Sequence, residues 1–146
     1  MKKLVFALAA AGMLFSGLAH ADAISDRKAV MKEKVGASMG VLAKTAKGEM
    51  DFDAAAVLAA FQTINSATEG FADLFPAGSE SGGETTASPK IWEDMDGFKA
   101  ALAKLRSDAA AAADAAPQDK DAFMVVFGQV AGNCKACHET YRVMKN

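Results

Sequence analysis

The sequence predicts an all-α protein folded as an antiparallel up-down four-helix bundle. Two observations support this fold class. The chain is rich in alanine and has no convincing run in which apolar and polar residues alternate, so strands are not expected. Pro76, Pro89 and Pro117 all fall at the edges of long segments with a helical period. Four amphipathic helices with mostly short joins fold most simply as a bundle.

The expected helices span roughly residues 24–47, 52–73, 89–115 and 120–144. Each carries apolar residues at steps of three and four, which form one stripe facing the core. The four stripes contain, in order, Met31, Val35, Met39 and Leu42; Val57, Phe61, Ile64, Thr68 and Phe71; Ile91, Met95, Phe98, Leu102 and Leu105; and Phe123, Phe127, Val130, Cys134, Cys137 and Tyr141.

Local signals mark several helix ends. Gly48 suits a left-handed cap after the first helix, and Ser88 before Pro89 suits the start of the third. The alanine run at 109–113 lets two helices approach closely. Only the polar, glycine-rich stretch at 74–88 is expected to form a long loop.

The N-terminus predicts export. Lys2 and Lys3 precede an apolar run that is short for a membrane span, and Ala19-His20-Ala21 fits a signal peptidase site. We therefore expect residues 1–21 to be a signal peptide cleaved near Ala21, with an uncleaved anchor as the alternative. Residues 22–146 are then one periplasmic domain with no stable membrane insertion.

The mature domain is mildly acidic. Loss of two lysines changes 16 basic and 18 acidic residues to 14 and 18, a net charge of about −4. This balance disfavours nucleic acid and anionic membranes as partners, and leaves a basic protein partner open.

The chemistry of the chain is concentrated in "GNCKACHETYR" at residues 132–142. At about 100° per residue, Cys134, Cys137 and His138 share one face of the fourth helix, which is its apolar stripe. His138 is the one histidine left after the signal peptide is removed, and the chain has no other cysteine.

Four kinds of site use motifs of this type. A zinc site would need carboxylates to complete four ligands, and a thioredoxin-like dithiol belongs after a strand. A disulfide across C-x-x-C closes too small a loop to stabilise much. Covalent haem attachment, with both thiols linked to the haem and His138 as the proximal iron ligand, is favoured.

The chain resembles the class II c-type cytochromes, which include cytochrome c prime and its low-spin relatives. The resemblance rests on a C-terminal "CKACHETYR", on "RKAVMK" at 27–32, on "LFPAGSESGGETT" at 74–86 and on "IWEDMDGFKA" at 91–100. It implies one covalent haem c per chain in the bundle core, and a protein that carries electrons or binds gases rather than an enzyme.

The resemblance also implies roles for individual residues. Cys134 and Cys137 would be the thioether links and His138 the proximal ligand. Arg142, one turn later, would lie beside the proximal face as a fixed positive charge.

Arg27 would pair with a haem propionate. Many relatives have glutamine at the next position, where this chain has Lys28. Glu84 and Thr85 resemble a loop that touches the haem edge. Trp92 is expected to pack, with a place near the macrocycle as the alternative.

Met31 distinguishes the functional hypotheses, because the resemblance puts it on the open side of the iron. As sixth ligand it would give a low-spin His/Met haem for electron transfer with redox partner proteins. If it only packs there, a five-coordinate, high-spin iron could bind nitric oxide or carbon monoxide.

The third hypothesis is a haem-free helical interaction module with a disulfide. Dimers are frequent among relatives that resemble cytochrome c prime, and a spare apolar face on the first two helices would permit a homodimer. No hydrolytic triad is available without His138.

Overall fold

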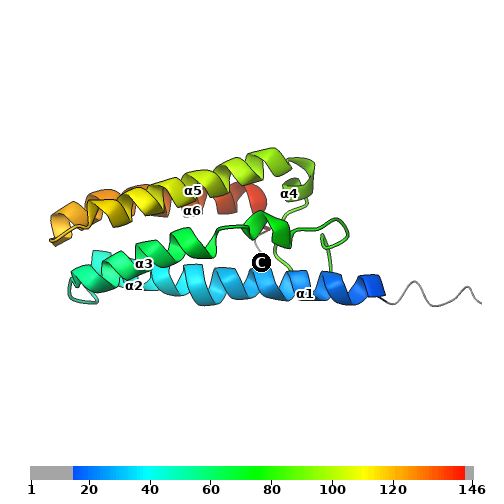
Figure 1. Cartoon of the computed structure of the whole chain (residues 1–146), viewed down its shortest axis with the longest axis horizontal. Helices are drawn as coiled ribbons and strands as arrows, with labels where there is room; N and C mark the ends of the chain where they lie inside the picture. The colour runs from blue at the N-terminus through cyan, green and yellow to red at the C-terminus, as the bar shows by residue number, and fades with distance from the viewer. Residues whose placement is uncertain (1–14, 144–146) are drawn as a thin grey trace, which may run out of the picture.

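The computed structural model describes residues 15–143 of the 146-residue chain, and this part forms a four-helix bundle (Figure 1). The predicted fold class is therefore confirmed. The elements are α1 (Phe15–Ala29), the π-helix η1 (Val30–Gly36), α2 (Ala37–Lys47), α3 (Ala54–Ala67), the 3₁₀ turn η2 (Phe71–Leu74), α4 (Lys90–Glu93), α5 (Met95–Ala115) and α6 (Lys120–Tyr141).

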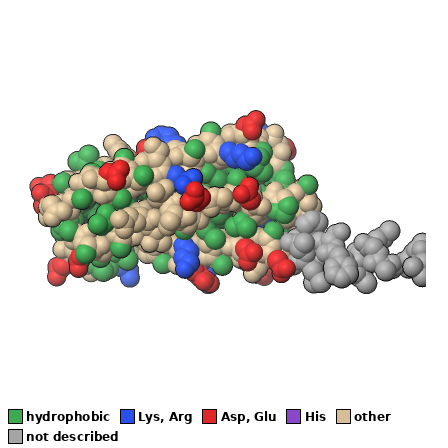
Figure 2. Space-filling model, viewed as in Figure 1, with side chains coloured by type: hydrophobic (Ala, Val, Ile, Leu, Met, Phe, Trp, Pro, Cys, Tyr) green, Lys and Arg blue, Asp and Glu red, His purple; other side chains and the backbone are tan. Residues whose placement is uncertain are grey.

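The bundle has four rods. α1, η1 and α2 run on without a break as the first rod, and α3, α5 and α6 form the others (Figure 1). α3 packs against α2 and α5, while α6 packs against α5 and α2, so the ring of rods closes. Figure 2 shows acidic, basic and apolar side chains interspersed on the face that it presents.

The predicted signal peptide lies largely outside the described residues, which begin at Phe15. α1 starts before the predicted cleavage site at Ala21, and cleavage there remains a prediction. Within residues 15–143, no helix is both long enough and apolar enough to cross a membrane.

The second and third predicted helices differ most from the observed ones. The second ends at Ala67 instead of residue 73, because Gly70 adopts a left-handed conformation (φ 65°) before η2 begins. The third is divided at Asp94, whose backbone leaves the helical region (φ −139°, ψ 57°) and whose side chain accepts a hydrogen bond from the Gly97 N–H. Asp94 thus ends α4 and caps α5.

The first predicted helix contains a π segment that its periodicity did not reveal, and the fourth ends at Tyr141. The predicted left-handed cap at Gly48 is confirmed, while Pro89 directly precedes α4 and Ser88 lies one residue earlier than a cap. Gly48 closes α2 with φ 76°, and the Ser88 hydroxyl accepts a hydrogen bond from the Lys90 N–H at the start of α4.

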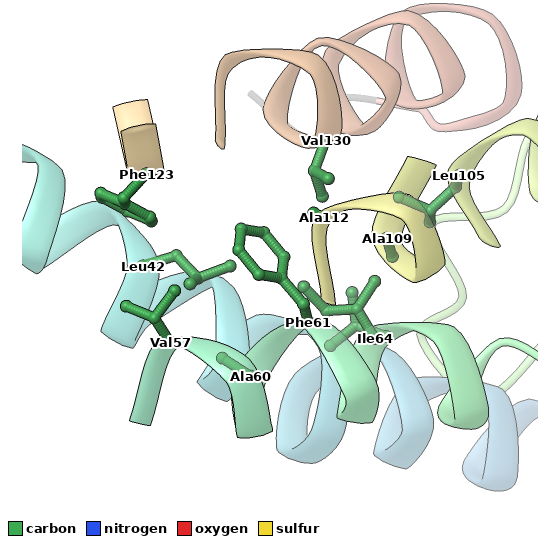
Figure 3. Packing of buried hydrophobic residues seen from close by; sticks show 11 residues of the cluster. Leu42, Val57, Ala60, Phe61, Ile64, Leu105, Ala109, Ala112, Phe123 and Val130 are labelled. Carbon is green, nitrogen blue, oxygen red and sulfur yellow. The ribbon is translucent and has the colours of Figure 1, made fainter. Parts of the chain in front are cut away.

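The main hydrophobic core fills the body of the bundle (Figure 3). Every residue of the four predicted stripes is buried or half-buried. The Phe61 and Phe123 rings pack with their centroids 6.3 Å apart, and Ala109 and Ala112 bring α5 close to its neighbours. A second, aromatic cluster of Phe71, Phe75, Ile91, Phe98, Leu102 and Tyr141 lies at the other end.

Truncation of a core side chain should lower the stability of the protein. Phe61 is fully buried, so Phe61→Ala should lower the free energy of unfolding by about 3–5 kcal/mol, through lost transfer energy and a residual cavity. Val125 is 67% exposed, and Val125→Ala should change the free energy of unfolding by less than about 0.5 kcal/mol. Urea unfolding followed by circular dichroism measures both values. Similar effects for the two variants would contradict the assigned core.

Candidate haem site

A cavity of about 580 Å³ lies where the two hydrophobic clusters meet. Its walls come from the first rod, the loop 74–88, the aromatic cluster and the C-terminal half of α6. Met31 packs against both clusters, and so lies at their junction. Every residue predicted for the site lines this cavity: Arg27, Met31, Glu84, Thr85, Cys134, Cys137, His138 and Arg142.

α6 contributes the three residues of the C-x-x-C-H motif to one wall. Cys134 and Cys137 are half-buried, and His138 is exposed where it borders the open cavity. The Cys134 thiol donates a long hydrogen bond of 3.6 Å to the Val130 carbonyl one turn earlier. The predicted shared face of these side chains is therefore the face that lines the cavity.

The thiols do not resemble those of a redox catalyst. Burial raises the pKa of Cys134 and of Cys137 above the ordinary value, whereas reactive cysteines have a lowered pKa. Among residues 22–143, whose side chains the structure describes, no group of three or more histidine, cysteine, aspartate or glutamate side chains could hold a metal ion. The raised pKa values of the two thiols weigh against the dithiol alternative.

His138 is suited to bind a metal through a neutral nitrogen. Desolvation by the surrounding protein, followed by the positive charge of Arg142, lowers the pKa of His138 below its ordinary value. A neutral imidazole keeps a free lone pair, and this is the form in which histidine binds metals. Arg142 also donates from Nε to the Thr86 hydroxyl, with 3.4 Å between the two atoms.

The first rod contributes the wall that carries Met31. Met31 and Met39 both line the cavity and are half-buried, with Val35 between them. Gly36 lines it as well. A thioether and an imidazole thus border the same apolar space from two different rods.

Arg27 holds the loop 74–88 against the first rod. It is 4% exposed, and its two terminal nitrogens donate to the Leu74 carbonyl, the Ser79 hydroxyl and carbonyl, and the Thr85 hydroxyl at 2.8–3.2 Å. Its guanidinium also lies over the Phe75 ring, 4.6 Å from the centroid. The propionate contact remains a prediction, while the structure shows Arg27 as an anchor of the loop.

The same loop is fastened at its other end to the end of α6. The Val143 N–H donates to the Thr86 carbonyl at 2.8 Å, and the Ser88 N–H donates to the Tyr141 carbonyl at 3.0 Å. Glu84 has a left-handed backbone (φ 54°), which is uncommon outside glycine and often marks a functional turn. The loop therefore connects the Met31 rod to the His138 rod across the cavity.

Trp92 packs as expected for a structural residue. Its indole N–H donates to the Pro76 carbonyl at 3.2 Å, and its ring meets Phe75 edge to face. Ser79 and Thr86 were not identified from the sequence. Each depends on a partner more than 50 positions away, and no local pattern marks such a pair.

Replacing Arg27 should loosen this loop. In Arg27→Lys a single ammonium cannot reach all the acceptors of the guanidinium, so we expect about 2–3 kcal/mol less stability and faster hydrogen exchange in residues 74–86. Lys28 donates only one exposed bond to the same loop, at Gly83, so Lys28→Ala should change stability by less than about 0.5 kcal/mol. Equal protection in both variants would contradict the anchoring role.

The cavity fits a haem. Its apolar walls, two adjacent thiols and an imidazole match a macrocycle that is linked at its edge and bound at its iron. Fold and cavity together define the class as a four-helix-bundle haem protein.

Comparison with known proteins leads to the family. Residues 22–142 match the family described as Cytochrome C'. The chain is 42% identical over 134 residues to a cytochrome c-556 of Agrobacterium fabrum, an alignment that covers 92% of this chain and 90% of the relative.

Two solved structures are similar to this one. A cytochrome c' from Rhodopseudomonas palustris superposes with a TM-score of 0.82 at 39% identity, over 86% of this chain and 98% of that chain. A point mutant of a cytochrome c prime from Alcaligenes xylosoxidans, in a nitric oxide complex, superposes with a TM-score of 0.74 at 28% identity, over 86% and 97%.

The chain therefore belongs to the cytochrome c' family of class II c-type cytochromes. It carries one covalently bound haem c and, like other members, is a haem protein without enzymatic activity. The proteins of this family are periplasmic.

Proposed function

We propose that this protein is an electron-transfer cytochrome whose haem iron is bound by His138 and Met31. The observation that carries the proposal is that an imidazole on α6 and a thioether on η1 line one apolar cavity. A haem with histidine and methionine ligands has a raised potential, and exchanges electrons with redox partner proteins.

Each residue around the cavity then has a task. Cys134 and Cys137 hold the macrocycle by thioether bonds, and His138 supplies the nitrogen ligand. The half-buried position of Met31 between two hydrophobic clusters supports its assignment to the opposite side of the iron. The loop 74–88, held by Arg27 and by Thr86, covers the haem edge through Glu84 and Thr85.

A five-coordinate haem that binds a small gas is the second candidate. The nitric oxide complex of a related cytochrome c prime favours it, because that protein has the same fold. In this candidate Met31 packs over the iron without a bond. Arg142, close enough to lower the pKa of His138, then acts as a fixed charge on the proximal side.

Optical spectra of the purified periplasmic protein test the proposal. We expect low-spin spectra in the ferric and ferrous states, with little change when carbon monoxide is added. A high-spin ferrous spectrum that shifts readily with carbon monoxide would instead assign the second candidate. Retention of haem after acid–acetone extraction tests the two thioether bonds, and its loss would exclude them.

The predicted maturation belongs to the same proposal. We infer that the signal peptide is cleaved near Ala21, so that the mature protein begins at Asp22. N-terminal sequencing of the exported protein checks this position. The homodimer remains a prediction, and sedimentation of the holoprotein measures it.

A further inference from the structure

The first rod contains seven residues of π-helix, Val30–Gly36, between two regular α-helices. A π-helix pairs residues five apart, so it takes up more residues per turn than an α-helix. Such segments are rare, and are frequent at functional sites when they occur. This one contains Met31 and ends at Gly36.

The π segment changes which side chains face the cavity. Met31 and Met39 are eight residues apart, and in a regular α-helix they would point about 80° away from each other. Both nevertheless line the cavity. A π segment accommodates one extra residue, so Met31 and Met39 are oriented like two residues that are seven apart in an α-helix. Their side chains then point in directions about 20° apart. The π segment therefore brings Met31 into line with the rest of the cavity wall.

Gly36 permits this geometry. The residue five positions before it is Met31, and a Cβ placed on Gly36 would lie 2.9 Å from the Met31 carbonyl oxygen. That oxygen belongs to the backbone and cannot turn away as a flexible side chain could. Beyond the four nearest residues of the helix backbone on either side, the other atom within 4 Å of that Cβ is the Met31 carbonyl carbon, so the contact with the Met31 carbonyl opposes a side chain here.

We propose that Gly36 is a positioning residue, which sets where the Met31 side chain lies in the cavity by allowing the π turn to close on the Met31 carbonyl. A side chain at position 36 forces this turn toward α-helical pairing. The rod then rotates between Met31 and α2, and Met31 turns away from the cavity. The assignment of Met31 as an iron ligand rests on the proposed function; the geometry of the turn does not.

The test compares Gly36→Ala with Gly40→Ala in the holoprotein. Gly40 lies in α2 of the same rod, and a Cβ there meets nothing within 4 Å. We expect Gly36→Ala to shift the spectrum from low-spin to high-spin, to increase carbon monoxide binding and to lower the urea midpoint. Gly40→Ala should keep the spectrum and raise the midpoint. Matching spectra for the two variants would overturn the proposal.

Deletion of one residue provides a rescue. Removing exposed Lys34 places Gly36 four positions after Met31, which is α-helical spacing. In that background Gly36→Ala should no longer lower the urea midpoint or change the spectrum. If the alanine is equally harmful with and without Lys34, the π turn is not the reason for glycine, and the proposal fails.

Failure of the ligand assignment gives a different result. If Met31→Ala leaves the spectrum unchanged, Met31 is not the iron ligand and the proposed function fails. The urea midpoints of the four Gly36 and Lys34 combinations still test the turn, and carbon monoxide binding by Gly36→Ala still tests where Met31 lies. If the wild-type protein is high-spin and Gly36→Ala binds carbon monoxide with the same affinity as the wild type, the positioning role is overturned.

Discussion

His138→Ala is expected to remove the proximal ligand and most of the holoprotein. His138 is the one histidine within residues 22–146, so no second imidazole is available to take its place. Loss even of a residue that supports a metal ligand costs about 10–100-fold, and we expect the yield of mature haem protein to fall by at least about tenfold. Haem staining of denaturing gels and the visible spectrum measure this loss.

Glu139→Ala is the matched control. Glu139 is the next residue on α6, and its carboxylate forms only an exposed pair with Lys135 at 3.8 Å. Such pairs contribute about 0–1 kcal/mol, so haem content and spectrum should be unchanged. Normal haem loading with a wild-type spectrum in His138→Ala would remove His138 from the proximal position.

Met31→Ala is expected to convert a low-spin spectrum to a high-spin one. The thioether is the candidate ligand on η1, and alanine has no donor atom. The reduction potential should fall, because a histidine and methionine ligand pair raises it. Carbon monoxide should bind the ferrous variant readily. Spectroscopy, potentiometry and gas titration measure the three changes.

Met39→Ala separates ligation from packing. Met39 also lines the cavity and packs against the main core, so its truncation should cost about 2 kcal/mol of stability. Its spectrum should stay low-spin. Loss of the low-spin spectrum in Met39→Ala but not in Met31→Ala would move the ligand assignment to Met39.

Much of the fold was predictable because its signals are local. A helical stripe repeats every three to four residues, and the stripe that contains Phe61 and Ile64 could be read without knowing what it packs against. The interruptions were less visible. Asp94 divides the third predicted helix by accepting a hydrogen bond from Gly97. An aspartate within an amphipathic segment does not by itself predict such a helix break.

The candidate site divides in the same way. Cys134, Cys137 and His138 lie within five consecutive residues, so their chemistry and their shared face were predictable from spacing alone. Arg27 was singled out through a family resemblance, as the partner of a propionate. Its bonds to Ser79 and Thr85 were not foreseen, because they join the first rod to a loop more than 50 positions away.

The sequence by itself determined the helical stripes and the covalent anchor for the cofactor, because both are patterns within one helix. Only the tertiary structure decided how the cavity is closed and where its side chains point. The loop 74–88 is held by Arg27 on one side and by the end of α6 on the other, and these contacts exist only after folding. The π turn at Gly36 is likewise a matter of backbone pairing, and no residue type specifies it alone.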